Sequence, residues 1–581
     1  MPTLATVIAF CVTLFNMIKI RLWPRILPLI QPQRLFTAFM IYGTSKTATN
    51  KNNGKKPILK KSIKTSIPIG SASLKRSFST KTPSAKNNVN TNDNINNGNN
   101  NTSNNVIFQD KFMDDVFWNL STQGPAFSVN PSNIDFIQEP NDFYNHLIDG
   151  IKRATKRITF ASLYLGTGKQ EIQMVKELEE ACMRNPELKV HILLDGLRGT
   201  RLGLVDGVKQ SSATLLLNLY KQYPNQVEIS LYHTPDLNGI LKKVLPPRVN
   251  ETIGVNHIKT YLFDDDLLLS GANLSKDYFT NRQDRYVWIR ATKSVSNYFN
   301  KIVEIIGSFS LKLSEDGQAV LPPKSVDPVT ASNEFKSYAY RKLANLLKAN
   351  QFYDNNGQCH SSPHDITQDV NDCTWIFPTI QMGPFDIRQD EVVTSFIFSQ
   401  IPKDSKFFIT SPYFNLTPNY LDLILSGKPQ LDIITCSPEA NGFHGAKGIS
   451  SAIPDCYSLI EKSFLQKVQD SGNNQRIKVQ EYIRKDWTYH GKGLWITAQK
   501  GQIPAITLIG SPNFGSRSVE KDLEAQIVLL TQNKSLQTKM DNERKYLWSD
   551  TRDANLDSFN QPERKVSLFV KIIVYLFGNY L

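Results

Sequence analysis

The sequence predicts an α/β fold made of two pseudo-symmetric domains, each with a mixed sheet, that share one active site. A His-x-Lys pair occurs twice, as His257 and Lys259 and again as His490 and Lys492. A Gly-containing turn and an Asn follow each pair, at Asn273 in the first copy. The matched surroundings indicate an internal duplication in which each copy supplies half of a site.

The segments ahead of the two His-x-Lys pairs have the same organisation. Each copy contains three apolar, β-branched runs, with a helix-spaced apolar pattern between two of them. Strands that alternate with helices are typical of a mixed α/β sheet. The expected strands are 158–166, 190–197 and 227–233 in the first copy and 407–416, 431–442 and 477–483 in the second.

The net charge of +14 is concentrated at the N-terminus of the 581-residue chain. Fifteen Lys and Arg residues precede Asp93, the first acidic residue, and the 52 that follow almost balance the 53 Asp and Glu residues. The hydrophobic content of 40% is sufficient for two domain cores. A nearly neutral body argues against the basic groove that a nuclease would be expected to carry, so no nucleic-acid partner is expected.

The composition also predicts the boundaries of the domains. Residues 1–86 are basic, hydroxylated and free of acids, as in a mitochondrial transit-type leader; an apolar run near the start keeps a signal anchor as the alternative. An apolar tail ends the chain and is too short to span a bilayer comfortably, so it either docks at a membrane interface or packs on the core. The remaining expected segments are an Asn-rich disordered linker (87–105), a first domain (106–330), an inter-domain segment (331–400), a second domain (401–560) and the tail (561–581).

The paired His residues are suited to chemistry on a phosphodiester. One imidazole can attack phosphorus while the other protonates the leaving oxygen. The two Lys residues, each on the same strand face as its His, can hold the non-bridging oxygens, and no metal or other cofactor is required. The expected supporting residues are Asn273 and Asn513 as hydrogen-bond donors, and Asp284 and Glu524, each eleven residues further on, as partners of the far His nitrogens.

Three weaker patterns have simpler explanations. Cys359, His360, His364 and Cys373 match no common zinc spacing, and a polar loop explains them. Gly166, Gly168 and Lys169 resemble part of a nucleotide-binding loop, but the full pattern is missing and a strand-to-helix turn accounts for both Gly residues. The loop with Gly442, His444 and Lys447 is either a phosphate or head-group cradle or an ordinary turn.

The two motifs resemble the signature of the phospholipase D superfamily, His-x-Lys-x4-Asp followed by an Asn element. His257, Lys259 and Asp264 match the first part of it in full, whereas Thr497 occupies the Asp position of the second copy. The resemblance implies the superfamily fold, with Asp264 counted among the catalytic residues. Because only the first copy keeps the Asp, we expect His257 to be the nucleophile and His490 the acid and base, with the reverse assignment still open.

Within the superfamily, residues 241–286 and 437–454 resemble the mitochondrial phosphatidylglycerophosphate synthases. This resemblance covers roughly residues 106–560. It implies transfer of a phosphatidyl group from CDP-diacylglycerol to glycerol 3-phosphate by a peripheral enzyme on the matrix side of the inner mitochondrial membrane. The alternatives are a serine-using or cardiolipin-forming relative, a phosphodiesterase or nuclease, and a non-catalytic scaffold.

Overall fold

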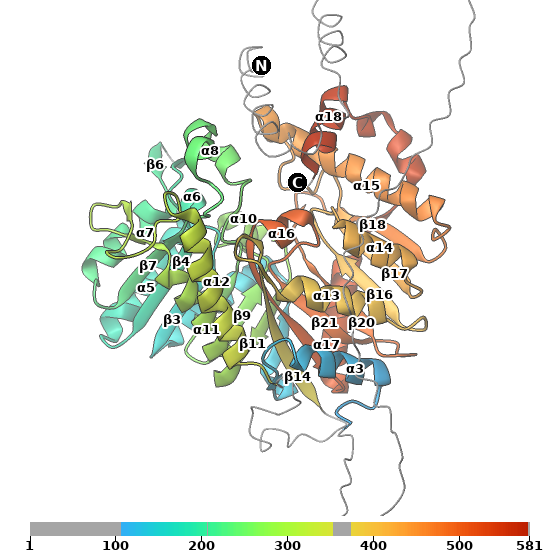
Figure 1. The fold of residues 1–581 in the computed structure, drawn as a ribbon, viewed down its shortest axis with the longest axis horizontal. Helices are drawn as coiled ribbons and strands as arrows, with labels where there is room; N and C mark the ends of the chain where they lie inside the picture. Colours follow the sequence, from blue (N-terminus) through green and yellow to red (C-terminus); the bar gives the residue numbers. More distant parts are fainter. Residues whose placement is uncertain (1–105, 206, 353–372, 579–581) are drawn as a thin grey trace, which may run out of the picture. The chain divides into compact units, whose positions relative to one another are not determined.

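The computed structural model describes residues 106–205, 207–352 and 373–578, which lie within one compact unit. Two large mixed sheets dominate it, one in each half of the chain (Figure 1). The expected leader, the Asn-rich linker and the residues Cys359, His360 and His364 lie outside the described residues.

The first sheet has nine strands in the order β13-β12-β7-β4-β3-β8-β9-β11-β2. Its central strands β3, β4 and β7 are parallel, and the strands on either side of them run antiparallel. The bounds are β2 (Ile134–Ile137), β3 (Arg157–Ser162), β4 (Lys189–Asp195), β7 (Val227–Tyr232), β8 (Thr260–Phe263), β9 (Asp266–Ser270), β11 (Tyr286–Ile289), β12 (Leu311–Leu313) and β13 (Ala319–Val320).

The second sheet repeats this topology in the order β1-β14-β22-β21-β20-β16-β17-β18-β23. Its parallel strands β16, β17 and β18 correspond to β3, β4 and β7, and β20 corresponds to β8. The bounds are β1 (Phe127–Ser128), β14 (Thr374–Met382), β15 (Ile387–Arg388), β16 (Lys406–Thr410), β17 (Gln430–Cys436), β18 (Ile477–Tyr482), β20 (Gly493–Thr497), β21 (Pro504–Gly510), β22 (Leu523–Thr531) and β23 (Thr551–Ala554).

Helices cover both faces of each sheet, so most central strands are apolar on both sides. A central cluster joins the two halves through α11 (Lys293–Ser308), α12 (Ser332–Ala349) and α17 (Lys534–Trp548). The outer clusters contain α4 (Pro140–Arg153), α5 (Lys169–Arg184) and α7 (Ser212–Gln222) in the first half, and α3 (Lys111–Ser121), α13 (Gln389–Gln400), α14 (Pro418–Ser426) and α15 (Ile453–Asp470) in the second.

The boundary between the halves differs from the expected one at two places. Residues 374–400 were expected to lie between the domains, but they form β14, β15 and α13 of the second half, where β14 pairs with β22 over nine residues. Residues 111–128 also pack there, because α3 joins the outer cluster and β1 pairs with β14. All nine residues of β14 are buried, so its sequence lacks the polar–apolar alternation by which a strand is recognised. Its length and the Pro at 378 also made a strand hard to predict.

Short elements lie at the carboxyl edge of the parallel strands. They are α6 (Gly196–Gly199), the hairpin of β5 (Gly203–Val205) and β6 (Val208–Gln210), α8 (Gly239–Val244), α9 (Pro247–Asn250), α10 (Lys276–Thr280), α16 (Ser516–Glu520) and the terminal helix α18 (Leu568–Phe577). A small parallel pair of β10 (Arg282–Gln283) and β19 (Thr488–Tyr489) joins the two halves. Among the described residues, every helix is too short or too polar to cross a bilayer.

Candidate active site

Each His-bearing segment binds through its backbone to the other half of the molecule. The N–H of His257 donates to the carbonyl of Leu523, at 2.9 Å, and the N–H of Leu523 donates to Val255. The N–H of His490 donates in the same way to the carbonyl of Gln283, at 2.7 Å. Leu523 and Gln283 immediately precede the expected acids, so these pairings bring each acid to the His of the opposite half.

Two His–carboxylate pairs result, and both cross between the halves. Nδ1 of His257 donates to the carboxylate of Glu524, 3.0 Å from each oxygen, and Nδ1 of His490 lies 2.6 Å from Oδ2 of Asp284. Burial lowers the pKa of both imidazoles well below the ordinary value, and Lys259 and Lys492 lower the pKa of His257 and His490, respectively, further. A carboxylate at Nδ1 fixes the tautomer whose Nε2 carries the lone pair.

Burial also changes the acids and the lysines. Burial raises the pKa of Asp284 to about 6 and also raises the pKa of Glu524. It lowers the pKa of Lys492 to about 8 and that of Lys259 well below its usual range. The ammonium groups lie beside their own His residues, because Nζ of Lys259 donates to the His257 carbonyl at 2.7 Å and Nζ of Lys492 donates to the His490 carbonyl at 2.9 Å.

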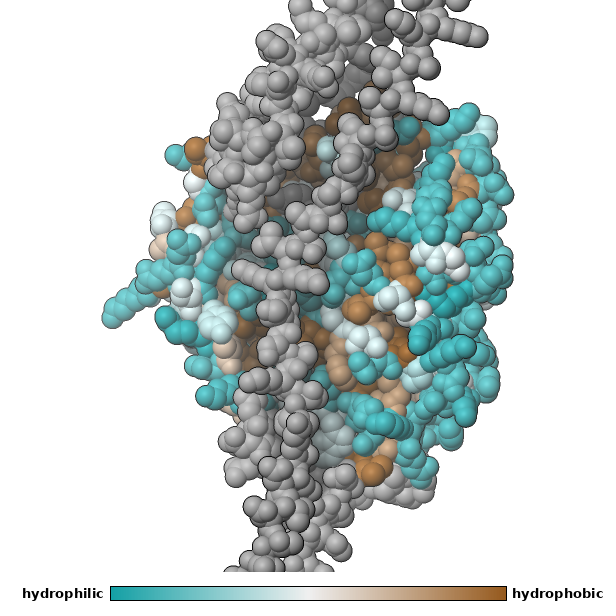
Figure 2. All heavy atoms as spheres, turned by 45° about the vertical axis from the view of Figure 1, so that its right-hand side comes forward, coloured by the Kyte–Doolittle hydropathy of each residue, from teal (hydrophilic) through white to brown (hydrophobic). Residues whose placement is uncertain are grey.

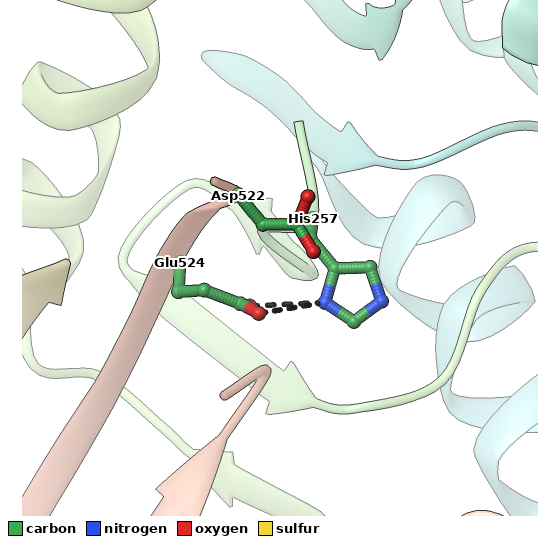
Figure 3. Close-up of side chains that lie close together, drawn as sticks. All are labelled: His257, Asp522 and Glu524. Atoms are coloured by element: carbon green, nitrogen blue, oxygen red, sulfur yellow. Dashed lines mark hydrogen bonds and ion pairs between the residues drawn. The ribbon is translucent and has the colours of Figure 1, made fainter. Parts of the chain in front are cut away.

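His257, Glu524 and Asp522 lie close enough together to be considered as metal ligands (Figure 3). The two carboxylates already accept hydrogen bonds from the protein. Glu524 accepts from Ser518 and His257, and Asp522 accepts from the Val255 N–H and from the guanidinium of Arg517, at 3.0 Å each. Since a guanidinium beside Asp522 opposes binding of a second cation, hydrogen bonding accounts for this cluster.

Several residues at the site had no distinguishing pattern in the sequence. The hydroxyl of Tyr278 lies 3.4 Å from Nε2 of His490 and accepts from the amide of Asn273 at 3.0 Å. The ring of Tyr413 meets the His490 ring edge-on, with centroids 5.8 Å apart. Asp195 accepts from the Asn256 N–H and so supports the residue before His257. These contacts depend on the fold, so the spacing of the residues did not reveal them.

The expected amides have different surroundings. Asn273 is buried, and its amide group donates to Tyr278. Asn513 is half-buried, and its backbone N–H donates to Ser518, the residue that also donates to Glu524. The Oδ1 atoms of both side chains are buried with no hydrogen-bond partner among the described residues. Both Asn residues therefore lie one hydrogen bond away from a His–carboxylate pair.

Known proteins are similar to this chain over most of its length. Residues 147–305 match the family model "Cardiolipin synthase, PLD-like domain". A Dictyostelium discoideum protein named probable CDP-diacylglycerol–glycerol-3-phosphate 3-phosphatidyltransferase is 69% identical over 82% of this chain and 82% of its own length. The human mitochondrial protein of that name is 39% identical over 78% of this chain and 84% of its own.

The chain belongs to this phosphatidyltransferase family.

A solved structure confirms the fold of this family member. Phosphatidylserine synthase from Haemophilus influenzae Rd KW20 superposes with a TM-score of 0.60 over 80% of this chain and 97% of its own, at 20% identity. The expected α/β fold with two phospholipase D-like halves is therefore confirmed. At this identity the likeness concerns the fold alone.

Asp264 does not lie with the other motif residues of the phosphatidyltransferase. It occupies the β8–β9 turn, at the end of β8 away from His257, with φ +53°. Its carboxylate accepts from the backbone N–H groups of Thr155, Lys156 and Arg157 at 2.7 to 3.0 Å, and from the Thr155 hydroxyl. The expectation that Asp264 is catalytic is corrected by this geometry, because a carboxylate at the far end of the strand holds the start of β3.

The two loops considered for phosphate binding do not form the expected phosphate-binding site. The carboxylate of Glu171 lies against Gly166 and Gly168 and accepts from the N–H of Lys276, so a negative charge already occupies that turn. Lys169 is exposed. In the second loop, Gly442 lies against the Arg282 guanidinium near the site, whereas His444 and Lys447 are exposed. The first loop therefore does not fit a nucleotide, and only the Gly442 end of the second borders the site.

Proposed function

We propose that this chain transfers the phosphatidyl group of CDP-diacylglycerol to glycerol 3-phosphate, giving phosphatidylglycerophosphate and CMP in the pathway to cardiolipin. The observation that carries the proposal is the pair of His–carboxylate contacts between the halves, which gives two oriented imidazoles in one site. The enzyme name of the relatives, which match this chain over about four-fifths of its length, supports the same reaction.

The first half-reaction forms a phosphohistidine. Nε2 of His257 attacks the phosphatidyl phosphorus, the bond from phosphorus to the CMP oxygen breaks, and His490 donates a proton to that oxygen. Both imidazoles are neutral in the free enzyme because burial lowers their pKa. The negative charges of the bound pyrophosphate raise the pKa of His490, so the general acid takes up its proton with the substrate.

The second half-reaction reverses these roles. His490 accepts the proton of a glycerol 3-phosphate hydroxyl, the hydroxyl oxygen attacks phosphorus, and the bond to His257 breaks. Lys259 and Lys492 stabilise the charge that develops on the non-bridging oxygens. Glu524 and Asp284 keep the two imidazoles in the tautomers that these steps need.

His257 is the nucleophile in this proposal for a reason that the sequence did not provide. Its side chain is 13% exposed, against 5% for His490, and no described residue hydrogen-bonds its Nε2. Nε2 of His490, in contrast, lies 3.4 Å from the Tyr278 hydroxyl and 3.1 Å from Nζ of Lys492. Nε2 of His257, whose lone pair has no hydrogen-bond partner among the described residues, is therefore the better nucleophile. Because Asp264 lies far along its strand, its loss in the second copy no longer bears on this choice.

A burst experiment tests both the reaction and the intermediate. Purified enzyme mixed with CDP-diacylglycerol, without acceptor, should release about one CMP per site rapidly, and the quenched protein should carry a phosphatidyl group by mass spectrometry. H257A should show no burst and H490A a burst slowed at least about 10²-fold, whereas H146A, at a half-buried His on α4 outside the site, should behave as wild type. A panel of glycerol 3-phosphate, serine and phosphatidylglycerol identifies the acceptor. Preferred use of serine would contradict the proposal.

We also propose that the enzyme is a peripheral mitochondrial protein that docks on a bilayer by the edge that holds the site. Exposed apolar side chains lie on three elements of that edge: Leu204 and Val208 of the β5–β6 hairpin, Ile240 and Val244 of α8, and Leu568, Phe569, Ile572 and Tyr575 of α18. We call this set the docking edge. In Figure 2, hydrophobic atoms gather at the upper end of the molecule, where α18 lies in Figure 1.

The position and charge of the docking edge support a lipid surface. The amide of Asn415, just after β16, donates to the carbonyl of Gly578, which fixes the end of α18 near the carboxyl edge of β16. Exposed Lys209, Lys242, Lys243 and Lys571 are interspersed with its apolar residues. Apolar and cationic side chains together are typical of surfaces that bind anionic lipids. The mitochondrial names of the relatives and the acid-free leader support the compartment.

A further inference from the structure

Arg282 is a buried cation whose ion-pair partner among the described residues, Asp277, is itself largely exposed. Its side chain is 13% exposed, and its nearest carboxylate, on the exposed Asp277, is 3.7 Å away. Its Nε donates to the hydroxyl of Thr488 at 3.0 Å, and its guanidinium lies over the ring of Tyr278, 4.8 Å from the centroid. Thr488 and Tyr278 are neutral, and the one carboxylate in range belongs to the solvent-exposed Asp277. Since a buried charge that is only weakly compensated is costly, this arrangement indicates that a further anion completes it.

The neighbouring arginines show what a structural role looks like in this fold. Arg285 forms two 2.9 Å bonds to the carboxylate of Glu543 and also donates to the Leu508 carbonyl and the Thr507 hydroxyl. Arg517 pairs with Asp522 at 3.0 Å. Arg282, only three residues before Arg285, lacks such a pair. Its guanidinium therefore remains available to a ligand.

The position of Arg282 puts that ligand on the His490 side of the site. Arg282 lies on β10, directly opposite Thr488 of β19, two residues before His490. Tyr278 contacts both Arg282 and His490. On the other side, a Cβ added at Gly442 would lie 2.6 Å from a guanidinium nitrogen, so the loop after β17 covers Arg282 closely.

We propose that Arg282 binds a phosphate monoester on the leaving-group and acceptor side of the site, and so selects a phosphorylated acceptor. The inference rests on the proposed function, in which His490 protonates departing CMP and then activates the acceptor. Both CMP and glycerol 3-phosphate carry a phosphate monoester, and they occupy this side in turn. Lys259 and Lys492 are committed to the phosphate being transferred, whereas a guanidinium can bind a second phosphate in bidentate geometry.

Acceptor kinetics test this role. In R282Q, kcat/KM for glycerol 3-phosphate should fall about 10- to 100-fold, mainly through KM, because a charged hydrogen-bonding group is lost. The rate with glycerol, the same alcohol without phosphate, should fall by a smaller factor, because glycerol has no phosphate contact with Arg282 to lose. R282K should recover part of the KM because it restores charge without the planar fork. R290Q, which removes an exposed Arg from the same half, is the matched control.

Two further measurements separate the sources of the phosphate. Exchange of labelled CMP into CDP-diacylglycerol, without acceptor, reports the nucleotide alone; a raised KM for CMP in R282Q would show that Arg282 serves CMP as well. Calorimetric binding of glycerol 3-phosphate to H257A and to H257A/R282Q reports the acceptor without turnover. Unchanged binding together with an equal loss of rate for glycerol and glycerol 3-phosphate would overturn the proposal. Arg282-dependent binding of glycerol 3-phosphate, together with wild-type enzyme that forms no phosphatidylglycerophosphate, would refute the proposed reaction and leave the subsite standing.

Discussion

At the scale of single residues, the decisive feature is that each His of the proposed active site is paired with an acid from the opposite half. Glu524 holds His257 and Asp284 holds His490, and both acids are fully buried. Gly271 makes room for the second contact, because a Cβ there would lie 2.7 Å from an oxygen of Asp284. Neither half can therefore orient its own His.

The crossed contacts predict the effect of neutralising one acid. D284N should lower kcat about 10³-fold, because an amide no longer selects the tautomer of His490 that the proton transfers need. Steady-state kinetics on folded protein measures the loss. D390N is the matched control: Asp390 is equally buried, with a pKa raised to about 6, but it accepts from Thr379 and Gln526 instead of a His. Equal losses in the two variants would contradict an orienting role.

The buried ammonium of Lys492 predicts an alkaline limit. Burial lowers its pKa to about 8, so the group loses its proton as the pH rises through that value, earlier than an exposed Lys would. We expect kcat/KM to fall above about pH 8, because the neutral amine stabilises phosphate oxygens poorly. In K492R the guanidinium stays charged, so this fall should move to higher pH even if the absolute rate is lower. If kcat/KM of K492R fell at the same pH as that of wild type, Lys492 would be excluded as the source of the alkaline fall.

At the scale of elements, the motif Asp and its replacement have the same structural task. Asp264 follows β8 and holds the start of β3, and Thr497 ends β20 with its hydroxyl accepting from the N–H of Lys406 at the start of β16, at 2.9 Å. β8 and β20 are equivalent strands beside the equivalent β3 and β16. The asymmetry of the two motifs is therefore one of local hydrogen bonding, away from the chemistry.

This interpretation predicts a loss of stability without a loss of catalysis. D264A should lower the free energy of unfolding by about 1–3 kcal/mol, because three backbone N–H groups and a hydroxyl lose their acceptor. Urea denaturation measures this effect, and kcat per folded enzyme should stay within about twofold of wild type. D265A is the control, since the carboxylate of Asp265 forms, among the described residues, only a 3.8 Å ion pair with Arg157 at the surface. A large fall in kcat for D264A would contradict this interpretation and indicate that Asp264 is catalytic.

At the scale of the whole molecule, the halves interlock so closely that they form one enzyme. Arg285 of the first half is 1% exposed and inserts among Glu543, Leu508 and Thr507 of the second. The central hydrophobic cluster likewise draws residues from both sheets. The site and the docking edge then lie on one side of this unit, at the carboxyl edge of the parallel strands.

The docking edge predicts how the molecule meets a bilayer. F569E/I572E should weaken binding to vesicles containing anionic lipid about tenfold or more, because two exposed apolar side chains of α18 become charged. Co-sedimentation measures the change, with zwitterionic vesicles to isolate the contribution of the Lys residues. V392E is the matched control, because Val392 on α13 is 48% exposed, as Phe569 is 47% exposed, but lies on another element. Vesicle binding of F569E/I572E equal to that of wild type would refute the docking edge.

The sequence by itself determined the duplication, the alternation of strands and helices, and the residue types at the site. These follow from local patterns, since strand and helix periods and the eleven-residue spacing to Asp284 and Glu524 are properties of neighbouring residues. Only the tertiary structure decided that the acids cross to the opposite His, that Asp264 holds a turn, and that Arg282 lies buried on the His490 side with only a weak ion pair to Asp277. Spacing fixes which face a side chain occupies, whereas its partner depends on how two halves, 233 residues apart at their His residues, dock together.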